Sequence, residues 1–183
     1  MHQLLKPHPG SRGLAAVRVE AAVARPRTDR LVLTYTVTGQ VSDIRLPPVT
    51  APARADDLWR HTCFEAFVRA ASGPAYYEFN FAPSRQWAAY RFNGYRSGMR
   101  PAEIDAPAIE VRSGPASYTL QASLALSRLP DLPPEASWRL GLSAVIEDIS
   151  GGTSYWALAH PPGKPDFHHA DGFALEFSPA VPS

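Results

Sequence analysis

The chain has 183 residues, 45% of them hydrophobic and 19% charged, which predicts a globular domain with a buried core and excludes a disordered chain. Its 18 basic residues are balanced by 17 acidic ones, so the sequence lacks the basic excess of a nucleic-acid-binding protein and we expect no nucleic-acid partner. The single cysteine, Cys63, excludes an intrachain disulfide and any multi-cysteine metal site.

The N-terminal residues contain no apolar run of the length that a signal peptide requires. No later segment approaches the roughly 18 apolar residues of a membrane span. We therefore expect a cytoplasmic protein that has no membrane partner. We expect a single domain over residues 1–183, in which residues 1–12 form a flexible N-terminal tail.

Short segments with alternating apolar and polar residues fill the chain between its proline clusters, and proline marks loops because it interrupts helices and central strands. The expected strands are 14–24, 30–38, 61–70, 75–82, 86–93, 108–112, 118–126, 138–149, 154–159 and 173–177. No long window has a helical period, so the predicted class is all-β with nine or ten strands. The proline-rich crossover at 47–57 favours a two-layer antiparallel sandwich over an up-and-down barrel.

Residues 61–93 predict three consecutive antiparallel strands, whose side chains alternate between two faces. The expected core face carries Phe64, Ala66, Val68, Tyr77, Phe79, Phe81, Ala88, Tyr90 and Phe92. The opposite face is expected to carry Cys63, Glu65, Phe67, Tyr76, Glu78, Asn80, Trp87, Ala89 and Arg91. Four-residue turns would place Glu65 opposite Asn80 and Glu78 opposite Arg91. This mixture of charged groups and aromatic rings indicates a ligand site, and the alternative is an ordinary ion pair beneath a loop.

Three stretches of this region, 58–67, 76–84 and 87–90, read LWRHTCFEAF, YYEFNFAPS and WAAY. Together they resemble the superfamily of DOMON-like domains and family 9 carbohydrate-binding modules (CBM9), which have a tryptophan before a glutamate-containing strand and then a Tyr-Glu-Phe-Asn hairpin. The resemblance implies a jelly-roll β-sandwich that binds a small ligand, a sugar or haem, without chemistry of its own.

In the sugar-binding branch, aromatic rings stack on the sugar while carboxylate, guanidinium and amide groups bind its hydroxyls. Trp59, six residues before Glu65, is similar to one such tryptophan, and Arg91 is similar to an arginine on a later strand. Trp156 is the candidate for a second tryptophan. The expected ligand-binding residues are Trp59, Glu65, Glu78, Asn80, Trp87, Arg91 and Trp156.

Two other functions stay open at this point. A haem-binding domain would hold iron through methionine and histidine, and Met99 is the internal methionine available. A small glycoside hydrolase would use Glu65 and Glu78 as its carboxylate pair. We expect no enzyme, because Arg91 opposite Glu78 would lower the pKa that a general acid needs to have raised.

The segment 160–169 could bring histidines and Asp166 together as metal ligands. Its spacing matches no known metal motif, so we favour a rigid loop and expect no metal and, haem apart, no cofactor.

Overall fold

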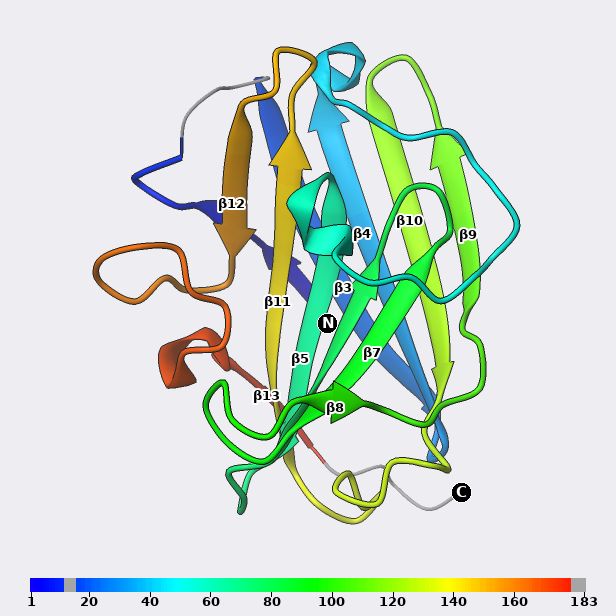
Figure 1. The fold of residues 1–183 in the computed structure, drawn as a ribbon, viewed down its shortest axis with the longest axis vertical. Helices are drawn as coiled ribbons and strands as arrows, with labels where there is room; N and C mark the ends of the chain where they lie inside the picture. Colours follow the sequence, from blue (N-terminus) through cyan, green and yellow to red (C-terminus); the bar gives the residue numbers. More distant parts are fainter. Residues whose placement is uncertain (12–15, 179–183) are drawn as a thin grey trace.

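The computed structural model describes residues 1–11 and 16–178, in which two antiparallel sheets pack face to face (Figure 1). The five-stranded sheet has the order β1 (His2–Leu4), β3 (Val17–Arg27), β4 (Arg30–Gly39), β10 (Ser117–Ala125), β9 (Ala108–Ser113). The eight-stranded sheet has the order β2 (Lys6–Pro7), β12 (Thr153–Ala157), β11 (Trp138–Glu147), β5 (Cys63–Ala70), β6 (Tyr76–Phe81), β7 (Trp87–Phe92), β8 (Arg100–Pro101), with β13 (Leu175–Phe177) also paired to β11. Short 3-10 helices occupy Val41–Asp43, Leu58–Arg60 and Ala170–Gly172. The predicted all-β sandwich is confirmed, with more short strands than expected.

The core lies between the two sheets and follows from period-two alternation along the long strands. In β4, every second side chain is buried, and these side chains face buried residues of β5 and β6. The facing sets are Leu31, Leu33, Tyr35 and Val37 against Phe64, Ala66, Val68, Phe79 and Phe81. Each large apolar side chain buried in this way contributes roughly 1.5–3 kcal/mol. One polar contact also crosses this interface, since the Tyr35 hydroxyl donates to the backbone oxygen of Glu65 at 2.6 Å.

The register of β5 against β6 is the predicted one, with Glu65 opposite Asn80 and Phe67 opposite Glu78. The register of β6 against β7 differs from the prediction by one residue, because Glu78 lies opposite Tyr90.

The physical reason is the connection between β6 and β7, which spans the five residues 82–86 rather than four. Arg85 adopts a left-handed backbone conformation there, with φ of 74°. A shift of one residue moves every side chain of a strand to the opposite face. Tyr90 and Phe92 therefore point outward, where core positions were expected. The outward-facing positions expected on β7 lie on the core side instead: Trp87, Ala89 and Arg91.

The N-terminal segment is not a free tail within the described residues. Strand β1 pairs with β3, β2 pairs with β12, and Leu5 between them is buried in the core. Residue 12 of the expected tail and residues 14–15 of the expected first strand lie outside the described residues.

The two ends of the strand path in the eight-stranded sheet are formed by β2 and β8, which have two residues each. Each of them ends in a proline, Pro7 or Pro101. In the described part of the chain, no helix has the length and apolar character needed to cross a membrane.

Candidate functional site

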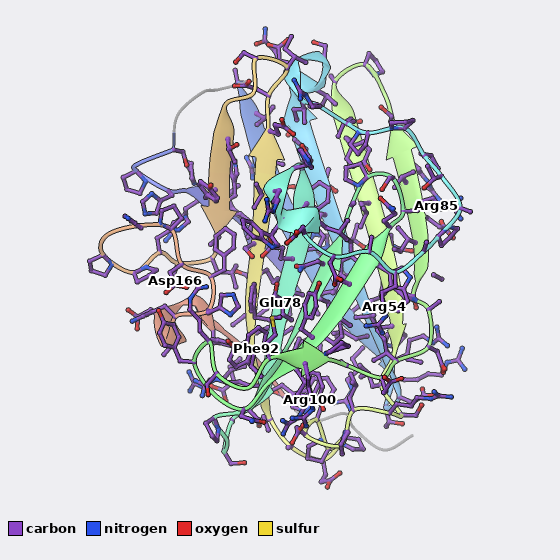
Figure 2. All side chains as sticks on the ribbon, in the orientation of Figure 1. Arg54, Glu78, Arg85, Phe92, Arg100 and Asp166 are labelled. Carbon is purple, nitrogen blue, oxygen red and sulfur yellow. The ribbon has the colours of Figure 1, made fainter. Side chains whose placement is uncertain are left out.

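A cavity of about 780 Å³ lies on the outer face of the eight-stranded sheet, on the side away from the five-stranded sheet. This volume is within the roughly 300–1,000 Å³ of small-molecule sites. Its floor is formed by side chains of the strands: Glu65, Phe67, Glu78, Tyr90, Phe92, Val145 and Tyr155. Figure 2 shows Glu78 and Phe92 on this side of the sheet, with Asp166 on the neighbouring loop.

One wall comes from the segment that leads into β5. Asp57 has a left-handed backbone with φ of 59°, and the 3-10 helix Leu58–Arg60 begins directly after it. This turn presents the ring of Trp59 at the cavity with 49% of the residue exposed. Asp56 is tied to the floor, because the Tyr90 hydroxyl donates to its carboxylate at 2.5 Å.

The opposite wall is the loop formed by residues 158–169, called here the covering loop. Asp166 anchors it, accepting hydrogen bonds from Arg96 at 2.8 Å and from the Tyr95 hydroxyl at 2.6 Å. Three prolines restrict the backbone of the loop at positions 161, 162 and 165. The loop thereby places Lys164, Phe167 and His168 along the cavity.

His168 is held in one orientation by Tyr76, whose hydroxyl lies 2.8 Å from Nδ1. The backbone N–H of Arg96 donates to the same hydroxyl oxygen at 3.2 Å, and we assign the hydroxyl proton to the contact with Nδ1. Burial and the nearby Arg96 lower the pKa of His168 to about 4. The ring is therefore neutral near pH 7, and we assign its proton to Nε2, which lies 3.7 Å from Oε2 of Glu78.

Glu78 is buried beneath the cavity and makes one strong hydrogen bond. Its Oε1 accepts from the Asn80 amide at 2.8 Å. Burial raises the pKa of Glu78, although the Asn80 hydrogen bond and the Arg96 charge oppose this shift. The expectation that Arg91 would lower this pKa is wrong, because Arg91 lies on the other face of the sheet.

Glu65 is the more isolated carboxylate, with only 3% of the residue exposed. Its Oε1 is fully enclosed and has no hydrogen-bond partner. Burial raises the pKa of Glu65 well above its usual range, and the charge of Glu78 raises it further. An unpaired buried carboxylate is costly when ionised, so this side chain is stabilised by a proton or by a ligand that brings donors or positive charge.

Aromatic rings cover the sheet between the carboxylates and the covering loop. Tyr76 and Phe92 stack with ring centroids 4.7 Å apart, and the ring of His168 packs edge-on against Phe92 at 5.1 Å and Phe67 at 5.0 Å. Such pairs contribute about 0.5–1.5 kcal/mol beyond the area that they bury. These rings surround the polar floor of the cavity with a rigid apolar surface.

The structure brings together part of the predicted ligand set. Trp59, Glu65 and Glu78 line the cavity, and Asn80 lies beside them as the amide donor to Glu78. Arg91 pairs instead with Asp131 on the other face, through contacts of 2.6 and 3.1 Å.

The other two tryptophans of the predicted ligand set, Trp87 and Trp156, are part of the core cluster. Trp87 is 5% exposed and has the Arg54 guanidinium 4.5 Å above its ring. Trp156 is 7% exposed, and its indole N–H donates to the Ser154 hydroxyl at 3.0 Å. Trp156 also borders a second cavity, of about 830 Å³, near the N-terminus.

Several lining residues were not predicted from the sequence as site residues. Tyr90 and Phe92 were assigned to the core face, and His168 was considered only as a metal ligand. The segment WAAYRF of β7 has bulky residues on both faces, so alternation alone does not choose between them. The length of the turn before β7 determines which face of the sheet each β7 side chain occupies.

The residues around the cavity do not fit haem. Met99 and His168 both line it, yet Nδ1 of His168 is bound by Tyr76 and Nε2 carries the proton facing Glu78. Both ring nitrogens thus already face polar partners, and neither points into open space for an iron ligand. For metal ions, the described residues contain no group of three histidine, cysteine or carboxylate side chains arranged to hold one.

The chain matches no family model and no curated protein, but solved structures share its fold. A candidate carbohydrate-binding protein from Bacteroides uniformis superposes with a TM-score of 0.65 at 14% identity, covering 93% of this chain and 83% of that one. A family 9 carbohydrate-binding module from Caldicellulosiruptor kristjanssonii in complex with glucose superposes with a TM-score of 0.56 at 13% identity, covering 93% and 81%. The module in complex with cellotriose gives 0.51 at 11% identity, covering 89% and 74%.

This chain has the CBM9 fold. The resemblance seen in the sequence is thus confirmed for the architecture. At these identities the likeness concerns the fold alone, so the ligand of the cavity is inferred from the residues that line it.

Proposed function

We propose that the cavity binds a saccharide and performs no covalent chemistry on it. The observation that carries the proposal is the pairing of an accessible indole ring, Trp59, with the carboxylates of Glu65 and Glu78 in one cavity. Sugar recognition needs an apolar ring surface for the C–H face of the sugar and polar acceptors for its hydroxyls. The fold supports the proposal, because two of the similar structures hold glucose and cellotriose.

The positions of the two carboxylates favour binding of a sugar and disfavour hydrolysis of its glycosidic bond. A glycosidase needs one proton donor and one ionised carboxylate, both in reach of the scissile bond. In this site Oε1 of Glu65 is enclosed, and Oε1 of Glu78 is taken by Asn80. The second oxygen of each carboxylate, Oε2, is left to accept a hydrogen bond from a hydroxyl group of a bound sugar.

Calorimetric titration with cellotriose tests the proposal, with Trp59→Ala as the variant. We expect the wild type to bind, and Trp59→Ala to lose at least about tenfold in affinity with an unchanged unfolding midpoint, because the ring is half exposed. Ile149→Ala is the matched control, since it removes an apolar side chain that is 62% exposed and lies outside the cavity. Absence of binding by the wild type, or equal binding by both variants and the wild type, contradicts the proposal.

Two further measurements test the alternative functions, glycoside hydrolysis and haem binding. Chromatography of cellotriose after prolonged incubation with the protein should show no shorter sugars. Addition of haem to the purified protein should produce no Soret band of a bound haem, because His168 is committed to Tyr76 and faces Glu78.

A further inference from the structure

The floor of the cavity carries acidic groups that make no ion pair with arginine or lysine. Among the described residues, Glu65 and Glu78 make no salt bridge to arginine or lysine. Arg96 borders the cavity and its charge acts on Glu78, but its guanidinium is paired with Asp166 at 2.8 Å. Two more carboxylates line the cavity: Asp56 accepts a hydrogen bond from Tyr90, and Asp57 lies 3.5 Å from Arg60.

Apart from Arg96 and Lys164, the groups that line the cavity supply no fixed positive charge. The ring of His168 is neutral at ordinary pH, because burial lowers its pKa. Cys63, from the same strand as Glu65, is buried and its pKa is raised. Tyr90 and Tyr155 add hydroxyl groups to the lining, and Lys164 lies on the covering loop. Burial and the charge of Glu78 raise the pKa of Glu65, so the two carboxylates disfavour ionising together.

The lining around this acidic floor suits a cation. The rings of Trp59, Tyr90, Phe92 and Phe167 border the same space. Aromatic faces attract an ammonium group within about 6 Å, and the attraction is stronger where water is excluded. An ammonium group also brings three hydrogen-bond donors, and Oε2 of Glu65 and Oε2 of Glu78 are the carboxylate atoms left to accept them.

A neutral sugar satisfies only part of this requirement, because its hydroxyls bring donors without positive charge. From this uncompensated acidic floor and its aromatic surround we propose that the cavity selects saccharides with a free, positively charged amino group over their neutral counterparts. This inference rests on the proposed saccharide-binding function and specifies the class of sugar. A bound ammonium group favours the ionised form of these carboxyl groups, so a carboxyl proton passes to the solvent on binding.

Three trimers of the same linkage test the inference: cellotriose, chitotriose and the fully deacetylated glucosamine trimer. They carry a hydroxyl, an acetamide and an ammonium group at the same position of each ring. Calorimetric titration near neutral pH, repeated in two buffers with different ionisation enthalpies, gives the affinity and the protons released. We expect the glucosamine trimer to bind at least about tenfold more tightly than the other two, with release of a proton.

Glu65→Gln keeps the shape of the side chain and removes its charge. We expect the ratio of the affinities for the glucosamine trimer and for cellotriose to fall towards one in this variant. Glu110→Gln on β9 is the matched control, since it removes the charge of a side chain that is 68% exposed on the other sheet, and we expect the preference to stay. Glu78→Gln serves as the second variant if circular dichroism shows that Glu65→Gln does not fold.

Each result decides a different question. If the three trimers bind equally well, or if both carboxylate variants keep the preference, the inference about amino sugars is overturned and saccharide binding stands. If none of the trimers binds, the proposed function fails and the inference fails with it.

Discussion

The hydroxyl of Tyr76 lies 2.8 Å from Nδ1 of His168, and this contact ties the covering loop to the eight-stranded sheet. The two residues are 92 positions apart in the sequence. A fixed loop keeps the cavity formed in the absence of ligand, which reduces the ordering cost of binding.

Tyr76→Phe removes this hydrogen bond and keeps the aromatic packing. We expect the free energy of unfolding to fall by about 1 kcal/mol, because the Nδ1 acceptor is left buried without a donor. Urea denaturation measures the change. Tyr118→Phe is the control, since its buried hydroxyl has no partner in the structure and its removal should cost nothing. An equal loss in both variants would contradict the role of the Tyr76 contact.

His168 should titrate far below an ordinary histidine. Burial, followed by the Arg96 charge, lowers its pKa to about 4, so the folded protein binds this proton more weakly than the unfolded chain does. The stability that depends on neutral His168 is present above the unfolded pKa of about 6.5 and is lost as the pH falls from there towards 4. An NMR titration of the imidazole signals, assigned with His168→Gln, should show a midpoint near 4. A midpoint near 6.5 would rule out the buried, neutral ring.

Glu65→Gln should stabilise the ligand-free protein at neutral pH. Burial raises the pKa of Glu65, so the folded state holds this proton more tightly than the unfolded state, and stability falls as the pH rises above the unfolded pKa of about 4.3. We expect Glu65→Gln to exceed the wild type by about 1–2 kcal/mol near pH 7, with a smaller difference near pH 4. Chemical denaturation across this range measures it, and His168 contributes equally to both proteins. A variant less stable than the wild type at neutral pH would show that ionised Glu65 is compensated.

Arg91→Ala should affect stability and spare ligand binding. The guanidinium pairs with Asp131 through two contacts on the face away from the cavity. Because the pair is partly solvent-exposed, we expect a loss of about 1 kcal/mol in the free energy of unfolding. A double-mutant cycle with Asp131→Ala isolates the pair. A matching loss of saccharide affinity would place Arg91 in the site after all.

The class of the fold and the first hairpin of the site could be predicted from the sequence, because alternation and a short connection determine both. The pairing of Glu65 with Asn80 is an example. The second hairpin could not be predicted, since one extra residue in its turn inverts β7, and Arg85 carries no glycine-like signal for its left-handed backbone.

The position of the covering loop could not be predicted from the sequence either, for a different reason. Its position depends on contacts between residues far apart in the chain, such as Arg96 with Asp166 and Tyr76 with His168. Local periodicity holds no information about such contacts. The sequence therefore predicts a polar, aromatic face and a rigid loop at 160–169, and it does not predict that this loop lies over that face.

The proline-ended strands β2 and β8 have a consequence for self-association. A sheet edge with free backbone donors recruits strands from other molecules, which leads to aggregation and domain swapping. Pro7 and Pro101 remove a backbone donor at each end of the strand path, and each of these strands has only two residues. Both ends of the strand path therefore offer few backbone donors to a strand of another molecule, which disfavours edge-to-edge growth of the sheet that carries the cavity.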